Sequence, residues 1–405
     1  MNESLLDQMR RLIVQPLNES GISTVIVIDA LDECEDDEPA SAILSVLGRL
    51  VSDIPKVKFF LTGRPEPRIY QGFRLPLLAK MTDIFVLHEV EPDRVYSDIR
   101  LFFQNSFSEL AEVRRGLGGW PTDQELDQLC ERAAGLFVYA AATVKFIGDN
   151  KRNPRKQLDL LLGSQKVGVH EGKSLDSLYM TILREAFGDD NPEDDTKTRS
   201  VIGAVILTAN PLSPSSIAIL LGLDVEDVLP LLSSVNSLLI FQEDSNHPVL
   251  PFHKSFPDFI TDPTRCTNPR FQIFPPDHHS KLLIGCLGFM NRTLEKNMCG
   301  LPDGVANSDV SNLKEKTEEH INSTLRYACM SWHTHLVGLV DADITPANEP
   351  AITPILRQFL ETKFLCWLEV LSVLGAVRNA VEALQVAMDW SRVRRVSTLD
   401  VAQSY

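Results

Sequence analysis

Residues Thr24 to Cys34 read "TVIVIDALDEC", a stretch in which four consecutive branched apolar residues run directly into the acids Asp29, Asp32 and Glu33. The apolar run from Val25 to Ile28 has no polar alternation, which is typical of a parallel strand with helices on both faces. In open parallel sheets, ligands bind beyond the carboxyl ends of the strands, where these acids lie. The stretch therefore predicts an α/β unit with an acidic ligand-binding edge.

Two further apolar runs extend this unit. Val57 to Leu61 predicts a neighbouring parallel strand, and Ile84 to Leu87 predicts a third strand. Between the first two strands, residues 38–54 place their apolar side chains on one stripe of a helix. The order strand, helix, strand assigns residues 1–90 to an α/β unit that is small for a doubly wound domain.

The acids alone fit two interpretations equally well. P-loop nucleotide hydrolases place an acid directly after a buried strand to hold Mg²⁺ and to orient the attacking water. In that interpretation Asp29 lies on the metal side, and Asp32 or Glu33 polarises water. An acidic loop that offsets helix-dipole charge is the alternative. The second strand, "VKFFLTGRPEPR", favours the phosphate site, because its Arg64 follows the strand end and a guanidinium binds a terminal phosphate bidentately.

From Pro92 onward the sequence pattern is helical. Two short apolar runs at 237–243 and 247–253, separated by a polar turn, predict a two-stranded wing after helices and hence a winged-helix module. A linker is expected at 163–173. Amphipathic periodicity predicts helices at 94–107, 122–134, 136–147, 155–162, 175–186, 195–208, 214–221, 225–235, 277–297, 316–330, 332–340 and 355–389.

The composition excludes several classes of protein. The 405 residues carry a formal net charge of -16, which repels nucleic-acid phosphates, and the basic clusters at 151–156 and 392–395 are short and are expected to be solvated helix ends. Seven cysteines without a C-x-x-C pair predict neither a disulfide framework nor a zinc site. The longest uncharged stretch, 200–223, contains two prolines and several serines, so it does not predict a membrane span. We expect a cytoplasmic protein that binds neither nucleic acid nor membranes.

A set of motifs resembles a known family. "VIVIDALDEC" and "FFLTGRPEP" resemble the Walker B and sensor-1 segments of a NACHT domain, in the fungal branch of the STAND class of signalling ATPases. The resemblance continues through five further segments, at 135–144, 174–183, 253–262, 325–336 and 364–375, so that it covers nearly the whole chain. It implies an α/β remnant of a P-loop NTPase core (1–90) followed by mostly α-helical domains: a helical domain (91–165), a winged helix (174–265) and a further helical domain (266–405).

The resemblance also implies roles for single residues. Asp29 resembles the acid on the Mg²⁺ side, Asp32 and Glu33 the catalytic acids, and Arg64 the sensor arginine. His253 resembles the winged-helix histidine that contacts the bound diphosphate, although a histidine that caps the helix or packs in the core fits its position equally well. The chain departs from the family pattern at Phe137, where family members often have a proline that approaches the base of the nucleotide. ATP or ADP with Mg²⁺ is the implied cofactor, and the implied partners are other STAND or NACHT protomers, with oligomerisation, in fungal self/non-self recognition and cell death.

The phosphate-binding motif G-x-x-x-x-G-K-[ST] does not precede Thr24. The nearest match, "GVHEGKS" at 168–174, is one residue short and follows the acids, so we interpret it as a linker that leads into a helix capped by Ser174. We therefore expect a fragment of a switch-and-scaffold protein, without the P-loop and the WD repeats and with little or no independent ATPase activity. Two alternatives stay open: a competent NTPase whose P-loop is supplied upstream or in trans, and a helical protein-interaction module.

Overall fold

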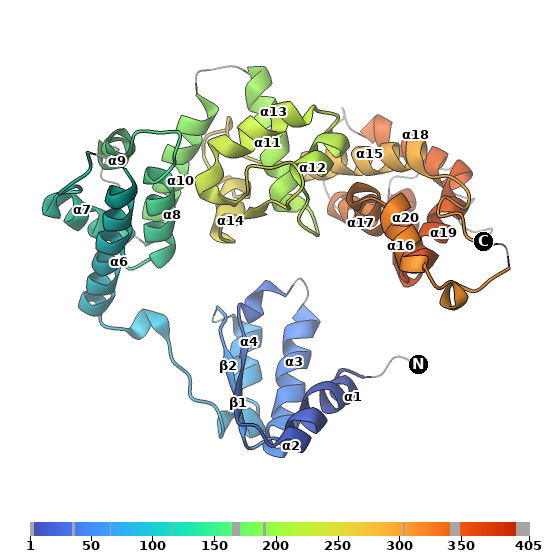
Figure 1. Cartoon of the computed structure of the whole chain (residues 1–405), viewed down its shortest axis with the longest axis horizontal. Coiled ribbons are helices and arrows are strands. Elements are labelled where there is room, and N and C mark those ends of the chain that lie inside the picture. Colours follow the sequence, from blue (N-terminus) through green and yellow to red (C-terminus); the bar gives the residue numbers. More distant parts are fainter. Residues whose placement is uncertain are drawn as a thin grey trace. The chain divides into compact units, whose positions relative to one another are not determined.

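The chain forms two compact units, residues 1–90 and residues 91–405, which are described separately. The computed structural model describes residues 4–34, 37–64, 66–114, 116–163, 171–188, 192–302, 304–340 and 349–393 (Figure 1). Both units are dominated by helices, as the sequence predicts for most of the chain.

The first unit contains a two-stranded parallel sheet. Strands β1 and β2 pair in register from Thr24 opposite Val57 to Ile28 opposite Leu61, which confirms the predicted parallel pairing. The elements of this unit are α1 (Leu5–Met9), a π-type turn (Arg10–Val14), α2 (Gln15–Ser20), β1 (Thr24–Ile28), a 3₁₀ turn (Leu31–Glu33), α3 (Asp37–Leu50), a 3₁₀ turn (Val51–Asp53), β2 (Val57–Leu61), α4 (Pro67–Phe73), α5 (Pro76–Ala79) and a 3₁₀ turn (Leu87–Glu89).

Among the described residues of this unit, helices cover one face of the sheet and leave the other exposed. Ile26 and Phe59 face a small core that includes Leu50 of α3, whereas Val25 and Val27 are 58% and 63% exposed. The prediction of helices on both faces is therefore wrong for this unit. The predicted third strand is also wrong: residues 84–86 form no strand and residues 87–89 form a 3₁₀ turn, because their apolar side chains are exposed and find no strand partner among the described residues.

The second unit contains fifteen described α-helices around one continuous apolar core that runs from Ile99 to Trp390. They are α6 (Pro92–Val113), α7 (Asp123–Ala133), α8 (Phe137–Ile147), α9 (Pro154–Gly163), α10 (Glu171–Phe187), α11 (Pro192–Leu207), α12 (Pro214–Leu221), α13 (Val225–Ser234), α14 (Ser255–Thr261), α15 (Pro275–Thr293), α16 (Leu313–His320), α17 (Ser323–Val340), α18 (Glu349–Thr362), α19 (Phe364–Val373) and α20 (Arg378–Val393), with 3₁₀ turns at Asn236–Leu238 and Asn307–Asp309.

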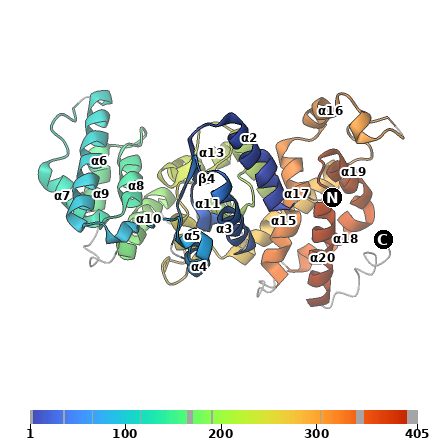
Figure 2. The same cartoon turned by 90° about the horizontal axis from the view of Figure 1, so that it is seen from below.

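The helices of this unit form successive groups. Both views show α6 to α9 gathered around α8, which is buried through Tyr139, Phe146 and Ile147 (Figures 1 and 2). At the other end, α15 packs along α17, and α17 contacts α20. Trp332 and Trp367 are fully buried there with ring centroids 5.9 Å apart, and the Trp367 indole donates a hydrogen bond to the Cys329 carbonyl. Aromatic packing therefore fixes the C-terminal group.

Several predicted helix boundaries are wrong. Helix α10 already begins at Glu171, so Ser174 lies inside it and is not its cap. Helix α17 continues through Met330 and Trp332, where the sequence predicts two helices, and it is separated from α16 at residues 321–322. The helix predicted at 355–389 is three helices, of which the last two are separated near Gly375, whose φ of 70° ends α19 in the left-handed region.

Two short strands, β3 (Leu239–Ile240) and β4 (Leu250–Pro251), pair antiparallel after α13 and form a small ribbon. The predicted pair of apolar runs is thus a strand pair, and a winged helix stays a prediction. Among the described helices, none is both long and apolar enough to cross a bilayer.

Candidate functional site

The carboxyl ends of β1 and β2 meet around Thr62, the residue that follows β2. Its hydroxyl donates a hydrogen bond to Asp29 Oδ1 and accepts one from the Ala30 N–H at 2.8 Å. Its backbone N–H donates to the Ile28 carbonyl at 3.0 Å, and its carbonyl accepts from the Leu31 N–H at 2.9 Å. One side chain therefore joins the acidic loop after β1 to the end of β2.

The loop after β1 turns through Ala30. This residue has φ 53° and ψ 51°, in the left-handed region that costs an L-residue roughly 1–2 kcal/mol. The turn directs Leu31 into a core beneath the edge, where it is 2% exposed and packs with Leu44 and Ile69. The hydrogen bonds of Thr62 and the burial of Leu31 hold the loop in this conformation.

Asp32 and Arg64 lie together at the same edge. Asp32 is 5% exposed, and its Oδ1 accepts a hydrogen bond from the Arg64 backbone N–H at 3.0 Å. The Arg64 Nε lies 3.5 Å from Asp32 Oδ2, and the arginine side chain remains 46% exposed. The backbone N–H and the guanidinium of Arg64 thus balance a buried carboxylate, while solvent still reaches the arginine.

Three of the predicted site residues, Asp29, Asp32 and Arg64, are therefore brought to one edge of one sheet. The backbone of Glu33 ends the 3₁₀ turn after β1, and its side chain lies outside the described part of the structure. Within the described ranges, no cluster of three or more His, Cys, Asp or Glu side chains could hold a metal ion. Asp29 is exposed, and its carboxylate is the kind of ligand that would hold Mg²⁺ beside a nucleotide, so binding of this ion stays a prediction.

The fifth predicted residue, His253, lies in the second unit at the start of α14. Its Nδ1 accepts a hydrogen bond from the Ser255 N–H at 3.1 Å and lies 2.7 Å from Ser255 Oγ. Ser255 Oγ in turn lies 2.8 Å from the hydroxyl of Tyr179, whose pKa is raised by burial. These contacts correspond to the helix-capping interpretation, and a contact of His253 with a diphosphate stays a prediction.

Sequence reasoning missed the role of Thr62 and the conformation of Ala30. A threonine directly after the second strand is a visible signal, because its hydroxyl both donates and accepts and the neighbouring strand ends in an acid. Nothing in the residue type of Ala30 indicates a left-handed conformation, which non-glycine residues rarely adopt.

Comparison with known proteins extends the sequence resemblance. A family model described as nephrocystin 3, N-terminal, matches residues 2–64, the part of the chain that contains β1, β2 and the edge between Asp29 and Arg64. The vegetative incompatibility protein HET-E-1 of Podospora anserina is 24% identical over 380 residues, which is 89% of this chain and 26% of that protein. The chain therefore spans about a quarter of the length of this relative. No solved structure matches the chain.

Together, the two matches confirm the predicted resemblance to fungal NACHT-type STAND proteins. The match to HET-E-1 covers both units, so the resemblance does not depend on the acidic motif alone.

Proposed function

We propose, from the resemblance to fungal NACHT-type STAND proteins, that the chain is the switch-and-scaffold part of a signalling protein and that the edge formed by Asp29, Thr62, Asp32 and Arg64 faces the phosphates of a nucleotide. The observation that carries the proposal is the convergence of two acids and an arginine at the carboxyl ends of two paired parallel strands. Ligands of open α/β sheets bind at this position.

Each residue has a role in the proposed site. Asp29, exposed and oriented by the Thr62 hydroxyl, would hold Mg²⁺. Asp32 fixes the Arg64 backbone and guanidinium. Arg64 is exposed enough to contact a terminal phosphate, the kind of charge-assisted contact that a guanidinium makes well. Glu33 is proposed as a further acid for orienting water. Bound nucleotide supplies the phosphates and Mg²⁺ neutralises their charge.

The second unit supports the scaffold part of the proposal. Its core is continuous from Ile99 to Trp390, and its buried aromatic groups give it a fixed surface on which other protomers or signalling proteins of the same class can assemble. HET-E-1 carries the name of an incompatibility protein, and we propose signalling of that kind for this chain.

Mapping of nucleotide contacts by NMR tests the proposal. Mg²⁺·ATP is titrated to about 20 mM into the isotope-labelled 405-residue chain. Since the sequence contains no phosphate-cradling glycine motif before Thr24, we expect weak binding, with a dissociation constant above ~1 mM, and shifts confined to the amides of residues 30–33 and 62–64. Shifts elsewhere only, or none at the highest concentration, would refute the proposed edge.

A further inference from the structure

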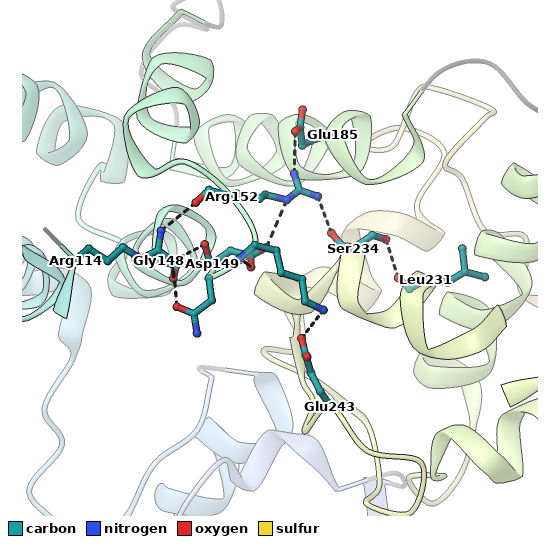
Figure 3. A network of polar contacts seen from close by, with 10 residues as sticks. Arg114, Gly148, Asp149, Arg152, Glu185, Leu231, Ser234 and Glu243 are labelled. Atoms are coloured by element: carbon teal, nitrogen blue, oxygen red, sulfur yellow. Dashed lines mark hydrogen bonds and ion pairs between the residues drawn. The ribbon is translucent and has the colours of Figure 1, made fainter. Parts of the chain in front are cut away.

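The loop between α8 and α9, residues 148–153, lies where the α6–α9 group contacts the ribbon-bearing group α10–α14. This loop contains the first half of the basic cluster that the sequence assigns to a solvated helix end. The assignment is wrong for Arg152, whose side chain is only 19% exposed. Figure 3 shows the loop at the centre of a polar network that extends to α10, α13 and the ribbon.

Arg114, at the end of α6, holds the loop in shape. Its guanidinium donates hydrogen bonds to the carbonyls of Gly148, Asp149 and Arg152 at 3.1, 2.7 and 2.9 Å, and to the Asn150 side chain at 3.0 Å (Figure 3). These acceptors all belong to one loop, so Arg114 fixes its conformation from within the α6–α9 group.

From this loop, two cations reach the ribbon-bearing group. Arg152 Nη1 lies 3.0 Å from Glu185 Oε1 of α10, an ion-pair contact that is not aligned as a hydrogen bond, and Nη2 donates to the Ser234 carbonyl at 3.5 Å. Lys151 Nζ lies 2.7 Å from Glu243 Oε1, which follows β3 (Figure 3).

A third cation crosses the same boundary from the body of α8. Lys145 donates a hydrogen bond to the Leu239 carbonyl of β3, and its ammonium lies 5.1 Å from the centre of the Phe252 ring. Burial lowers the pKa of Lys145. In each of these crossing contacts the α6–α9 group supplies the cation, and the other group supplies a carboxylate, a carbonyl or a ring face. The cations of these contacts therefore all lie on one side of the boundary.

The ribbon is small, so such contacts add appreciably to what holds it. Each of its strands has two residues, and a two-stranded hairpin of that size is not stable alone in water. Leu239 and Val249 are buried and the Val249 N–H donates to the Leu212 carbonyl at 2.9 Å, which anchors the ribbon to its own group, whereas Ile240 is 52% exposed. The strand β4 leads directly into Phe252 and His253, so whatever holds the ribbon also positions this segment.

We infer that Lys145, Lys151 and Arg152 form a charge-operated latch that fixes the ribbon and the end of α13 to the α6–α9 group. The latch opens locally when the charges are screened or removed, while the apolar core that the two groups share stays packed. Opening releases the ribbon and the segment that carries His253. The latch rests on contacts within the second unit, and it holds whether or not the first unit binds a nucleotide.

Hydrogen exchange of the full chain tests the latch. In Arg152→Gln we expect the amides of residues 236–252 to exchange about tenfold faster, while those of α17 stay unchanged, and 1 M NaCl should produce the same local acceleration in the unaltered chain. Arg155→Gln is the matched control, because Arg155 donates to the Gly116 carbonyl and stacks near Trp120 inside its own group. Equal effects of both variants, acceleration that includes α17, or no acceleration would each overturn the latch.

Reversing the charges of a surface ion pair gives a second test, in variants that are expected to fold. Lys151 and Glu243 are 54% and 55% exposed, so either can change sign without burying a charge. We expect Lys151→Glu to accelerate exchange in residues 236–252 about threefold and the double variant Lys151→Glu/Glu243→Lys to restore the original rate. Failure of the double variant to restore the rate, or a single variant without effect, would contradict the role of this pair.

Discussion

At the scale of single residues, the candidate site depends on a hydroxyl as well as on its charges. The acids and the arginine are readable in the sequence, but Thr62 sets their geometry by bonding Asp29 and the Ala30 N–H at once. Ala30 adopts its left-handed conformation between them at an energetic cost. Removal of the hydroxyl should therefore disturb the whole acidic loop.

Thr62→Val makes that test, because valine keeps the shape of threonine and removes its hydroxyl. The Ala30 N–H then loses its acceptor, which should destabilise the loop by about 1–2 kcal/mol and accelerate amide exchange at residues 30–32 by about tenfold. Thr62→Ser is the control, since it keeps the donor and acceptor. Exchange that is equally fast in both variants would assign the effect to packing instead of the hydroxyl.

At the scale of elements, helices α15 and α17 enclose histidines that the proposed site does not use. His279 Nδ1 lies 3.0 Å from His335 Nδ1, and His335 Nε2 lies 2.8 Å from the Tyr327 hydroxyl. Burial, with a contribution from nearby histidines, lowers the pKa of His335 to about 3. Burial and the charges of Lys281 and Arg199 lower the pKa of His278 to about 3. Folding of this group therefore requires neutral histidines.

This predicts a loss of stability in mild acid. The unfolded chain takes up protons below its histidine pKa of about 6.5, whereas the folded chain does not, so stability is present above that pH and falls below it. Between pH 7.5 and 5.5 each of the two histidines should lower the free energy of unfolding by about 1.4 kcal/mol. Urea unfolding at a series of pH values, followed by tryptophan fluorescence, measures how the free energy of unfolding changes with pH. His278→Gln should reduce this pH dependence by the contribution of one histidine. A slope that His278→Gln leaves unchanged would contradict the assignment.

Elements also show how far sequence reasoning reaches. The parallel pairing of β1 and β2 and the exact range of α12 follow from local pattern, because a continuous apolar run and a serine–proline start are strong signals. The prediction of a third strand is wrong, because an apolar run becomes a strand only when another strand is available to pair with it. The sequence does not predict the interruption between α19 and α20 near Gly375, since the apolar periodicity continues across it.

The residues of the acidic edge are predictable from the sequence, whereas the latch depends on residues far apart in sequence.

At the scale of the whole molecule, the two units differ in how much apolar surface they bury. The first unit has two separate clusters of five buried apolar residues each and a sheet with one exposed face, whereas the core of the second unit is continuous. All four tryptophans, at 120, 332, 367 and 390, belong to the second unit. Fluorescence therefore reports on that unit alone.

We expect the first unit to unfold at a lower urea concentration than the second, because stability scales with the buried apolar area. Circular dichroism should detect an early transition that tryptophan fluorescence does not follow, and amides of β1 and β2 should exchange faster than those of α17. Coincident transitions by both probes, with equal protection in β1 and α17, would show that the two units unfold together.

The central claim is that the edge at the ends of β1 and β2 is built for a terminal phosphate, and Arg64→Ala tests it most directly. NMR titrations with Mg²⁺·ATP and Mg²⁺·ADP compare this variant with the unaltered chain and with Arg74→Ala, whose guanidinium is held by Tyr70 in the same unit. Loss of a charge-assisted contact worth at least about 1.5 kcal/mol should weaken ATP binding by about tenfold or more, so that the ATP shifts are largely lost in a titration to about 20 mM, and leave ADP binding nearly unchanged in Arg64→Ala only. An equal loss for both nucleotides, or the same loss in Arg74→Ala, would contradict the claim.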